Sequence, residues 1–277
     1  MNKLPMDKQV AVIGALVEGC TIRSIERLTG VHRDTIMRLG VRVGEGCIGL
    51  LDRTMRGLHC ARLELDEQWG YVGKKQRHVT KQDNPLEVGD QWIFAAIDPV
   101  TKLVPCFRLG KRTVEDTNAF VHDLAGRLES RCQISVDGFN AYINAIESAF
   151  GADVDLGVIV KSFEAEPIGP GRYSPPKVVA TEKTIIMGSP DYKLISTSMI
   201  ERLNLTTRQQ CRRMSRLTLG YSKRFSNLRA ALGLHFAHYD LARVHASLRV
   251  TPAMEAGVTN SIWSVRELIE ASNIGSA

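Results

Sequence analysis

The strongest constraint on the fold is the hydrophobic pattern of residues 61–161, which alternates between the two-residue period of strands and the 3.6-residue period of helices. The pattern predicts strands at 61–66, 91–98, 103–109, 133–137 and 154–161, and helices at 113–129 and 140–150. Segments in which strands and helices alternate are typical of α/β folds. We therefore expect a mixed α/β core in the middle of the chain.

The composition is that of an ordinary globular protein, because 44% of the 277 residues are hydrophobic and 24% are charged. No apolar run approaches the ~18 residues of a membrane span, so no membrane partner is expected. The six cysteines are scattered singly without a Cys-x-x-Cys pair, which argues against a zinc ribbon or a disulfide framework. The expected location is the cytoplasm.

Residues 9–40 have the spacing of a helix-turn-helix unit. Thr21 can cap a second helix at 21–28, and Gly30 allows a tight turn before a third helix that starts at His32. The second helix is expected to bury Ile22, Ile25 and Leu28. The third is expected to bury Ile36 and Leu39, and its outward candidates for DNA contact are His32, Arg33 and Arg38. A plain helical hairpin is the alternative.

Positive charge is concentrated near the C-terminal end of the chain. Residues 201–250 contain ten Lys and Arg against two acids, although the whole chain has a net charge of only +6. A concentration of this kind favours a polyanionic partner such as DNA, because each neutralised phosphate releases counterions. A solvated basic helix face is the alternative.

Two carboxylates lie at the predicted ends of core strands, namely Asp66 after the first strand and Asp137 after the fourth. Asp98 ends the second strand and is a competing candidate, and a single acid at such a place usually caps a loop. Two acids on neighbouring strands would repel each other unless a cation lay between them, and Mg²⁺ accepts carboxylate oxygens. A third acid would complete a two-metal site for phosphoryl transfer.

Glu201 is the candidate for that third acid. Arg208 follows it by two helical turns on the same face, and Arg212 lies beyond, so a metal ligand would be followed by side chains that can contact DNA phosphates. Ser198 and Glu201 also have the spacing of a capping box, in which the glutamate binds back to the start of its helix. The spacing leaves both interpretations open.

Three segments that contain these acids resemble the DDE transposases of bacterial insertion sequences, above all the first-described insertion-sequence family. The segments are Leu65-Asp66-Glu-Gln-Trp69-Gly-Tyr71-Val-Gly73, Val136-Asp137-Gly-Phe-Asn-Ala-Tyr142 and Ile200-Glu201-Arg-Leu-Asn204-Leu-Thr-Thr-Arg208. The resemblance extends from about Gly57 to Tyr239. It implies an RNase H-like core and two Mg²⁺ or Mn²⁺ ions held by Asp66, Asp137 and Glu201. Some relatives have an N-terminal cysteine zinc motif, which this chain lacks.

The resemblance and the pattern together predict four parts. They are a helix-turn-helix DNA-binding domain at 1–46, a linker at 47–60, an RNase H-like catalytic domain at 61–250 with an insertion at 162–197, and a tail at 251–277. The implied activity is metal-dependent cleavage of DNA that leaves a 3′-hydroxyl, followed by attack of that hydroxyl on target DNA. A reaction that joins two element ends implies a homodimer or larger assembly, associated with the bacterial nucleoid.

Two other functions stay open. An RNase H-like nuclease would cut DNA without strand transfer, and a DNA-binding regulator derived from a transposase would bind without catalysis. Two further patterns have ordinary explanations: Gly44-x-Gly46-x-x-Gly49 matches a dinucleotide motif but follows a predicted helix, and His235-x-x-His238 lacks additional metal ligands. We expect the two histidines at the surface or on a phosphate.

Overall fold

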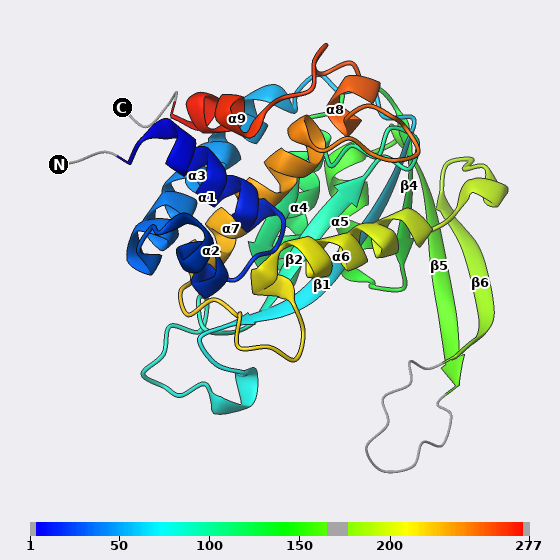
Figure 1. The fold of residues 1–277 in the computed structure, drawn as a ribbon. Helices are drawn as coiled ribbons and strands as arrows, with labels where there is room; N and C mark the ends of the chain where they lie inside the picture. The colour runs from blue at the N-terminus through cyan, green and yellow to red at the C-terminus, as the bar shows by residue number, and fades with distance from the viewer. Residues whose placement is uncertain (1–3, 165–176, 274–277) are drawn as a thin grey trace.

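The computed structural model describes residues 4–164 and 177–273, and it contains a central sheet with helices on both faces (Figure 1). The sheet has six strands in the order β3-β2-β1-β4-β5-β6. Their bounds are β1 Arg62–Val72, β2 Gly89–Ile97, β3 Phe107–Gly110, β4 Cys132–Asp137, β5 Val154–Glu164 and β6 Lys177–Met187. The predicted mixed α/β core is confirmed.

The strand directions follow from the connections. β1, β2 and β3 are neighbours in sequence and pair antiparallel, whereas β4 runs parallel to β1 and β5 runs parallel to β4. Parallel neighbours need a crossover, which α4 (Val114–Ala125) provides before β4 and α5 (Ala141–Phe150) provides before β5. β6 forms the edge of the sheet and pairs antiparallel to β5.

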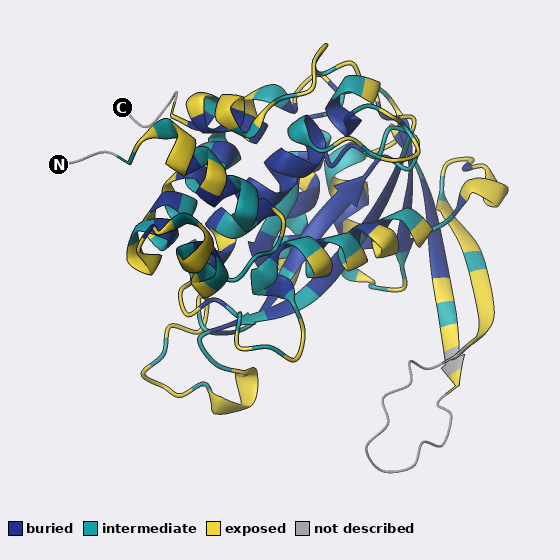
Figure 2. Ribbon diagram, viewed as in Figure 1, coloured by how far each residue is buried: buried dark blue, intermediate teal, exposed yellow. Residues whose placement is uncertain are grey.

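Helices cover both faces of the sheet. α4 and α5 lie on one face, and α6 (Ser198–Gln210) crosses the other (Figure 1). The ring of Phe94 on β2 lies 5.7 Å from that of Phe120 on α4 and 6.5 Å from that of Tyr142 on α5, measured between centroids. These aromatic contacts make the core layer beneath the sheet, and the strands there are buried in Figure 2.

The N-terminal part consists of α1 (Met6–Val17), α2 (Ile22–Thr29) and α3 (Arg33–Thr54). Thr21 caps α2 as expected, because its Oγ1 accepts the N–H of Ser24 at 3.1 Å, and Gly30 forms the turn with φ of +70°. Ile25 is fully buried, but the prediction that Leu28 points inward is wrong, since Leu28 is 74% exposed. A step of three residues falls about 60° short of a full helical turn, so Ile22, Ile25 and Leu28 are spread over about 120° of the helix surface. Leu28 therefore points away from the core.

The segment expected to be a linker differs from the prediction, because α3 continues through residues 47–54. Two glycines of α3 lie where other helices pack closely against it. A Cβ on Gly44 would lie 2.0 Å from the carbonyl oxygen of Ala230 in α7 (Phe225–Ala237), and one on Gly46 would lie 2.1 Å from that of Ser272 in α9 (Val265–Ser272). The glycine motif is therefore a packing surface and no dinucleotide loop.

Two other predicted segments also differ locally. Part of the expected insertion at 162–197 belongs to the sheet as the end of β5 and all of β6, and residues 165–176 lie outside the described residues. The expected tail contains α8 (Pro252–Glu255) and α9, which buries Leu268 and Ile269. Short 3-10 turns lie at Gln76–His78, Tyr192–Leu194 and Arg212–Met214, and a π turn lies at His238–Ala242.

Of the described helices, none combines the length and the apolar composition that crossing a membrane would require.

The glycine packing of α3 can be tested with one substitution. Gly44→Ala would push a methyl group into the backbone of α7, so we expect a loss of roughly 1–3 kcal/mol in the free energy of unfolding. Gly49→Ala is the matched control, because its Cβ would meet only the flexible Arg53 side chain at 3.4 Å and alanine favours a helix. Chemical denaturation of both variants checks this, and equal stability would contradict the packing role.

Candidate metal centre

Asp66 and Asp137 lie side by side on neighbouring parallel strands. β1 pairs with β4 up to Glu64 and Ser135, and each aspartate follows two residues later on its own strand. Asp137 ends β4, as the sequence predicts. The prediction that Asp66 ends its strand is wrong, because β1 continues to Val72 through its pairing with β2. Asp66 therefore lies in the middle of β1, level with Asp137, the last residue of the neighbouring strand β4.

Glu67 joins the two aspartates, which the sequence reasoning did not foresee. One carboxylate oxygen from each of Asp66, Glu67 and Asp137 lies within 4.8 Å of the others. Adjacent strand residues usually point to opposite faces, so the neighbour of Asp66 was not expected at the same site. The sequence signal that points to Glu67 is a second acid directly after Asp66. The competing candidate Asp98 is structural, because it accepts hydrogen bonds from Val100 N–H and the Thr101 hydroxyl in the turn after β2.

Burial and mutual repulsion change the acidity of this cluster. Burial, followed by the neighbouring charge of Asp137, raises the pKa of Asp66 to about 7, and the same two causes raise the pKa of Glu67 to about 7. Hydrogen bonds act in the opposite direction on Asp66, which accepts the N–H of Glu67 at 2.8 Å and the side-chain amide of Asn204 at 2.7 Å. Three acids this close favour a bound cation.

One buried oxygen of the cluster, Oε2 of Glu67, makes no hydrogen bond of good geometry, which fits a metal ligand role. Oε1 of the same carboxylate pairs with Nη2 of Arg112 at 2.5 Å. The hydroxyl of Tyr142 is buried beside Glu67, and burial, the charges of the three carboxylates and the interaction with Glu67 raise its pKa well above the usual value. Buried polar atoms without partners are costly, and carboxylate oxygens are the ligands that Mg²⁺ and Mn²⁺ prefer.

Helix α6 runs along β1 and is attached to it by polar contacts. Oε2 of the buried Glu64 accepts two N–H groups in the first turn of α6, at 2.7 and 3.0 Å. The Asn204 side chain binds Asp66, and the Asn204 carbonyl accepts from Gln68 at 2.6 Å. Because residues 64, 66 and 68 share one face of the strand, these contacts align α6 with the acidic cluster.

Glu201 lies in the first turn of α6 and is bound by its own neighbours. Its Oε1 accepts from Nζ of Lys161 and from the hydroxyl of Thr197. The alternative of a capping box between Ser198 and Glu201 is not formed, because Thr197 precedes the helix and its hydroxyl binds the Glu201 side chain. Glu201 is 53% exposed and does not belong to the 4.8 Å cluster, although its charge contributes to the raised pKa of Asp66.

The predicted arginines occupy different elements. Arg208 is in the last turn of α6 and donates to the carbonyl of Trp69 at 3.3 Å. Arg212 lies beyond the end of α6 in a 3-10 turn, so the prediction of one arginine row along a single helix face is wrong. The N-terminal candidates His32, Arg33 and Arg38 are exposed at the start of α3, where the His32 ring caps the helix by accepting the N–H of Asp34.

The two histidines of the His235-x-x-His238 pattern are not at the surface as predicted. Both are buried, and burial lowers the pKa of His235 to about 3 and that of His238 below its usual value. The His235 ring meets the hydroxyl of Thr207 at 3.2 Å, which ties α7 to α6. They are core residues.

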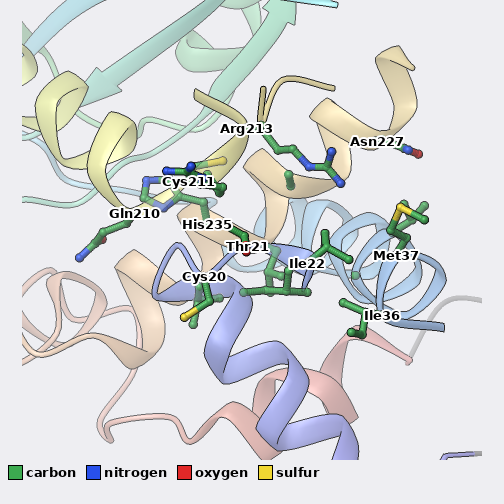
Figure 3. A pocket seen from close by; sticks show the side chains of 18 of the residues that line it. Cys20, Thr21, Ile22, Ile36, Met37, Gln210, Cys211, Arg213, Asn227 and His235 are labelled. Carbon is green, nitrogen blue, oxygen red and sulfur yellow. The ribbon is translucent and has the colours of Figure 1, made fainter. Parts of the chain in front are cut away.

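A cavity of about 500 Å³ lies apart from the acidic cluster, between the N-terminal helices and the segment that follows α6 (Figure 3). Ile22, Ile36 and Met37 line one side, and Cys211, Arg213 and His235 line the other. Burial there lowers the pKa of Arg213. None of the three clustered acids lines this cavity, so it is separate from the candidate metal centre.

Comparison with known proteins gives little detail. No protein-family model and no curated protein match the chain. Among solved structures, the chain is similar to the piggyBac transposase in its synaptic complex with hairpin DNA, with a TM-score of 0.41 and 11% identity. That similarity covers 98% of this chain and 71% of the other.

The raised pKa values predict how stability depends on pH without metal. In the unfolded chain both acids titrate near pH 4, whereas Asp66 and Glu67 titrate near pH 7 in the fold. Between those values the unfolded chain binds fewer protons, so the free energy of unfolding falls as the pH rises. Asp66→Asn should reduce this fall by about 2–4 kcal/mol. Denaturation in EDTA from pH 4 to 7 measures it, with the exposed Glu182→Gln as control. An unchanged fall in Asp66→Asn would contradict the raised pKa.

Proposed function

We propose that the protein is a DDE-type DNA transposase that cuts the ends of a bacterial insertion sequence and joins them to target DNA. The observation that carries the proposal is the meeting of Asp66 and Asp137 on adjacent parallel strands, beside a helix that bears Glu201. The strand order supports the RNase H-like core that belongs to this proposal, since an antiparallel β1-β2-β3 unit is followed by two helix–strand units that extend the sheet beyond β1.

In this proposal Asp66, Asp137 and Glu201 hold two Mg²⁺ or Mn²⁺ ions. When bound, such ions stabilise the attacking and leaving oxygens of an in-line phosphoryl transfer. The chain orients its own ligands: Asn204 fixes Asp66, and the Glu64 carboxylate anchors the start of the helix that carries Glu201. Lys161 must release Glu201 before that side chain can serve as a ligand.

DNA contacts in the proposal come from two regions. Arg208, which donates to the Trp69 carbonyl on β1, and Arg212, in the 3-10 turn after α6, would bind phosphates, which position the backbone without reading its sequence. The helix-turn-helix made by α2 and α3 would hold the element ends through His32, Arg33 and Arg38. Because two ends are cut and joined together, the active form in this proposal is a homodimer or larger assembly on DNA.

The rival functions differ in what they do with a cut end. A duplex that already carries a free 3′-hydroxyl needs no cleavage, so joining it to a plasmid isolates strand transfer. A transposase joins the two, whereas an RNase H-like nuclease cuts intact substrate without joining. A non-catalytic regulator does neither, although it binds the ends.

The roles of the acids predict a sharp contrast between conservative variants. Asp66→Asn, Asp137→Asn and Glu201→Gln should each lower Mg²⁺-dependent cleavage by roughly 10³-fold or more, because an amide removes the charge that a metal ligand needs. Glu182→Gln should retain full activity, since Glu182 lies exposed on β6. Strand cleavage and thermal melting are measured on all four proteins. An active, folded Glu201→Gln enzyme would overturn the choice of Glu201 as the third ligand.

The N-terminal role is tested separately by DNA binding. Replacing Arg33 and Arg38 by Ala should weaken binding to the element end roughly tenfold or more, and binding to random DNA much less, because contacts to base edges discriminate between sequences. Arg53→Ala, at the other end of α3, is the control. Equal losses on both DNAs would show that these arginines contact only phosphates.

A further inference from the structure

Arg112 lies between β3 and α4 at the edge of the acidic cluster, and two aromatic rings fix its side chain. The central carbon of its guanidinium is 4.3 Å from the ring centroid of Phe139 and 4.9 Å from that of Trp92. Contacts of this kind hold the flat guanidinium in one place, and stacking of this kind is favourable for arginine. The position of Arg112 therefore does not depend on its ion pair alone.

That ion pair is with the most deeply buried acid of the cluster. Nη2 of Arg112 lies 2.5 Å from Oε1 of Glu67, whose side chain is only 2% exposed, whereas the Arg112 side chain is 40% exposed. A buried carboxylate beside Asp66 and Asp137 needs a counter-charge, and Arg112 supplies one. The same side chain also reaches solvent.

Glu67 is only half satisfied by this arrangement. Its Oε2 is buried without a hydrogen bond of good geometry, and the buried side chain of Tyr142 lies beside this carboxylate. An oxygen of Glu67 also lies within 4.8 Å of ligand atoms from Asp66 and Asp137. Glu67 can thus serve a divalent cation, and such a cation would compete with Arg112 for the negative charge of that carboxylate.

We propose that Arg112 is the counter-cation of the centre without metal and becomes its phosphodiester-binding residue once metal is bound. In this exchange the Glu67 carboxylate leaves its ion pair with Arg112 and binds the metal ion instead. The inference rests on the proposed function for its phosphate ligand. The rings of Trp92 and Phe139 keep the released guanidinium beside the acidic cluster, where its paired N–H groups can bind two phosphate oxygens.

The exchange is tested first without DNA, by titrating Mn²⁺ into the full-length protein and measuring heat. Arg112→Ala should bind Mn²⁺ about three- to tenfold more tightly than the wild type, because a competing positive charge has been removed. Arg112→Lys keeps that charge and should bind Mn²⁺ like the wild type. Arg108→Ala is the matched control, since Arg108 pairs with Asp116 and is similarly exposed, at 42%. Thermal melting verifies that each variant is folded.

The same titration on Glu67→Gln shows whether Glu67 mediates the effect. Adding Arg112→Ala to Glu67→Gln should leave Mn²⁺ affinity unchanged, because the carboxylate for which the two cations compete is gone. The counter-cation role is overturned if folded Arg112→Ala binds Mn²⁺ no more tightly than the wild type, or if its gain persists in the Glu67→Gln background.

The phosphate role is tested by fluorescence anisotropy with a random-sequence duplex. In Mg²⁺, Arg112→Ala should reduce the salt dependence of binding by about one phosphate contact, and in EDTA it should change nothing. An equal loss in both buffers would overturn the exchange. A wild-type protein that binds no DNA would overturn the proposed function and the phosphate role together, while the Mn²⁺ titration would still decide the role of Arg112 as counter-cation.

Discussion

The contact between β1 and α6 is the interaction on which the candidate centre depends. Two strand residues advance about 6.6 Å and one helical turn about 5.4 Å, so alternate residues of β1 meet successive turns of α6. Glu64 binds the start of the helix, and Asp66 meets Asn204 about one turn later. A shift of one residue in β1 would turn Asp66 away and present Glu67 to α6 instead.

The cost of gathering acids is offset by contacts on both sides of the sheet. Asn204 supports Asp66 from the side of α6, and Arg112 supports Glu67 from the side of α4 and α5. Glu201 is similarly bound by Lys161. Each of these last two acids is therefore paired with a cation that a divalent ion would have to displace, so metal binding and side-chain release are one equilibrium.

Sequence periodicity predicted the order and type of the strands and helices in residues 61–161, because burial imposes that period on the side chains, but it did not predict all of their bounds. It failed where tertiary contacts satisfy residues that look like breakers. Glu67 and Gln68 hid the second half of β1, although Arg112 pairs with one oxygen of Glu67 and the Asn204 carbonyl accepts from the side-chain amide of Gln68. Gly44 hid the length of α3, because its reason lies in the distant backbone of Ala230. Likewise, the closeness of Glu67 to Asp137 at the end of β4 is a contact between residues distant in the sequence, which the strand pattern alone does not predict.

The length of α3 changes how the two proposed DNA-binding regions relate. The helix begins with the exposed Arg33 and Arg38 and packs through Gly44 against α7. A bond between His235 and Thr207 then connects α7 to α6, the helix that is aligned with the acids. In a transposase built this way, packed helices rather than a flexible linker would set the distance between the bound element end and the cleavage site. The position of the cut would then be fixed by the fold, because the contacts that join the two regions are buried and closely packed.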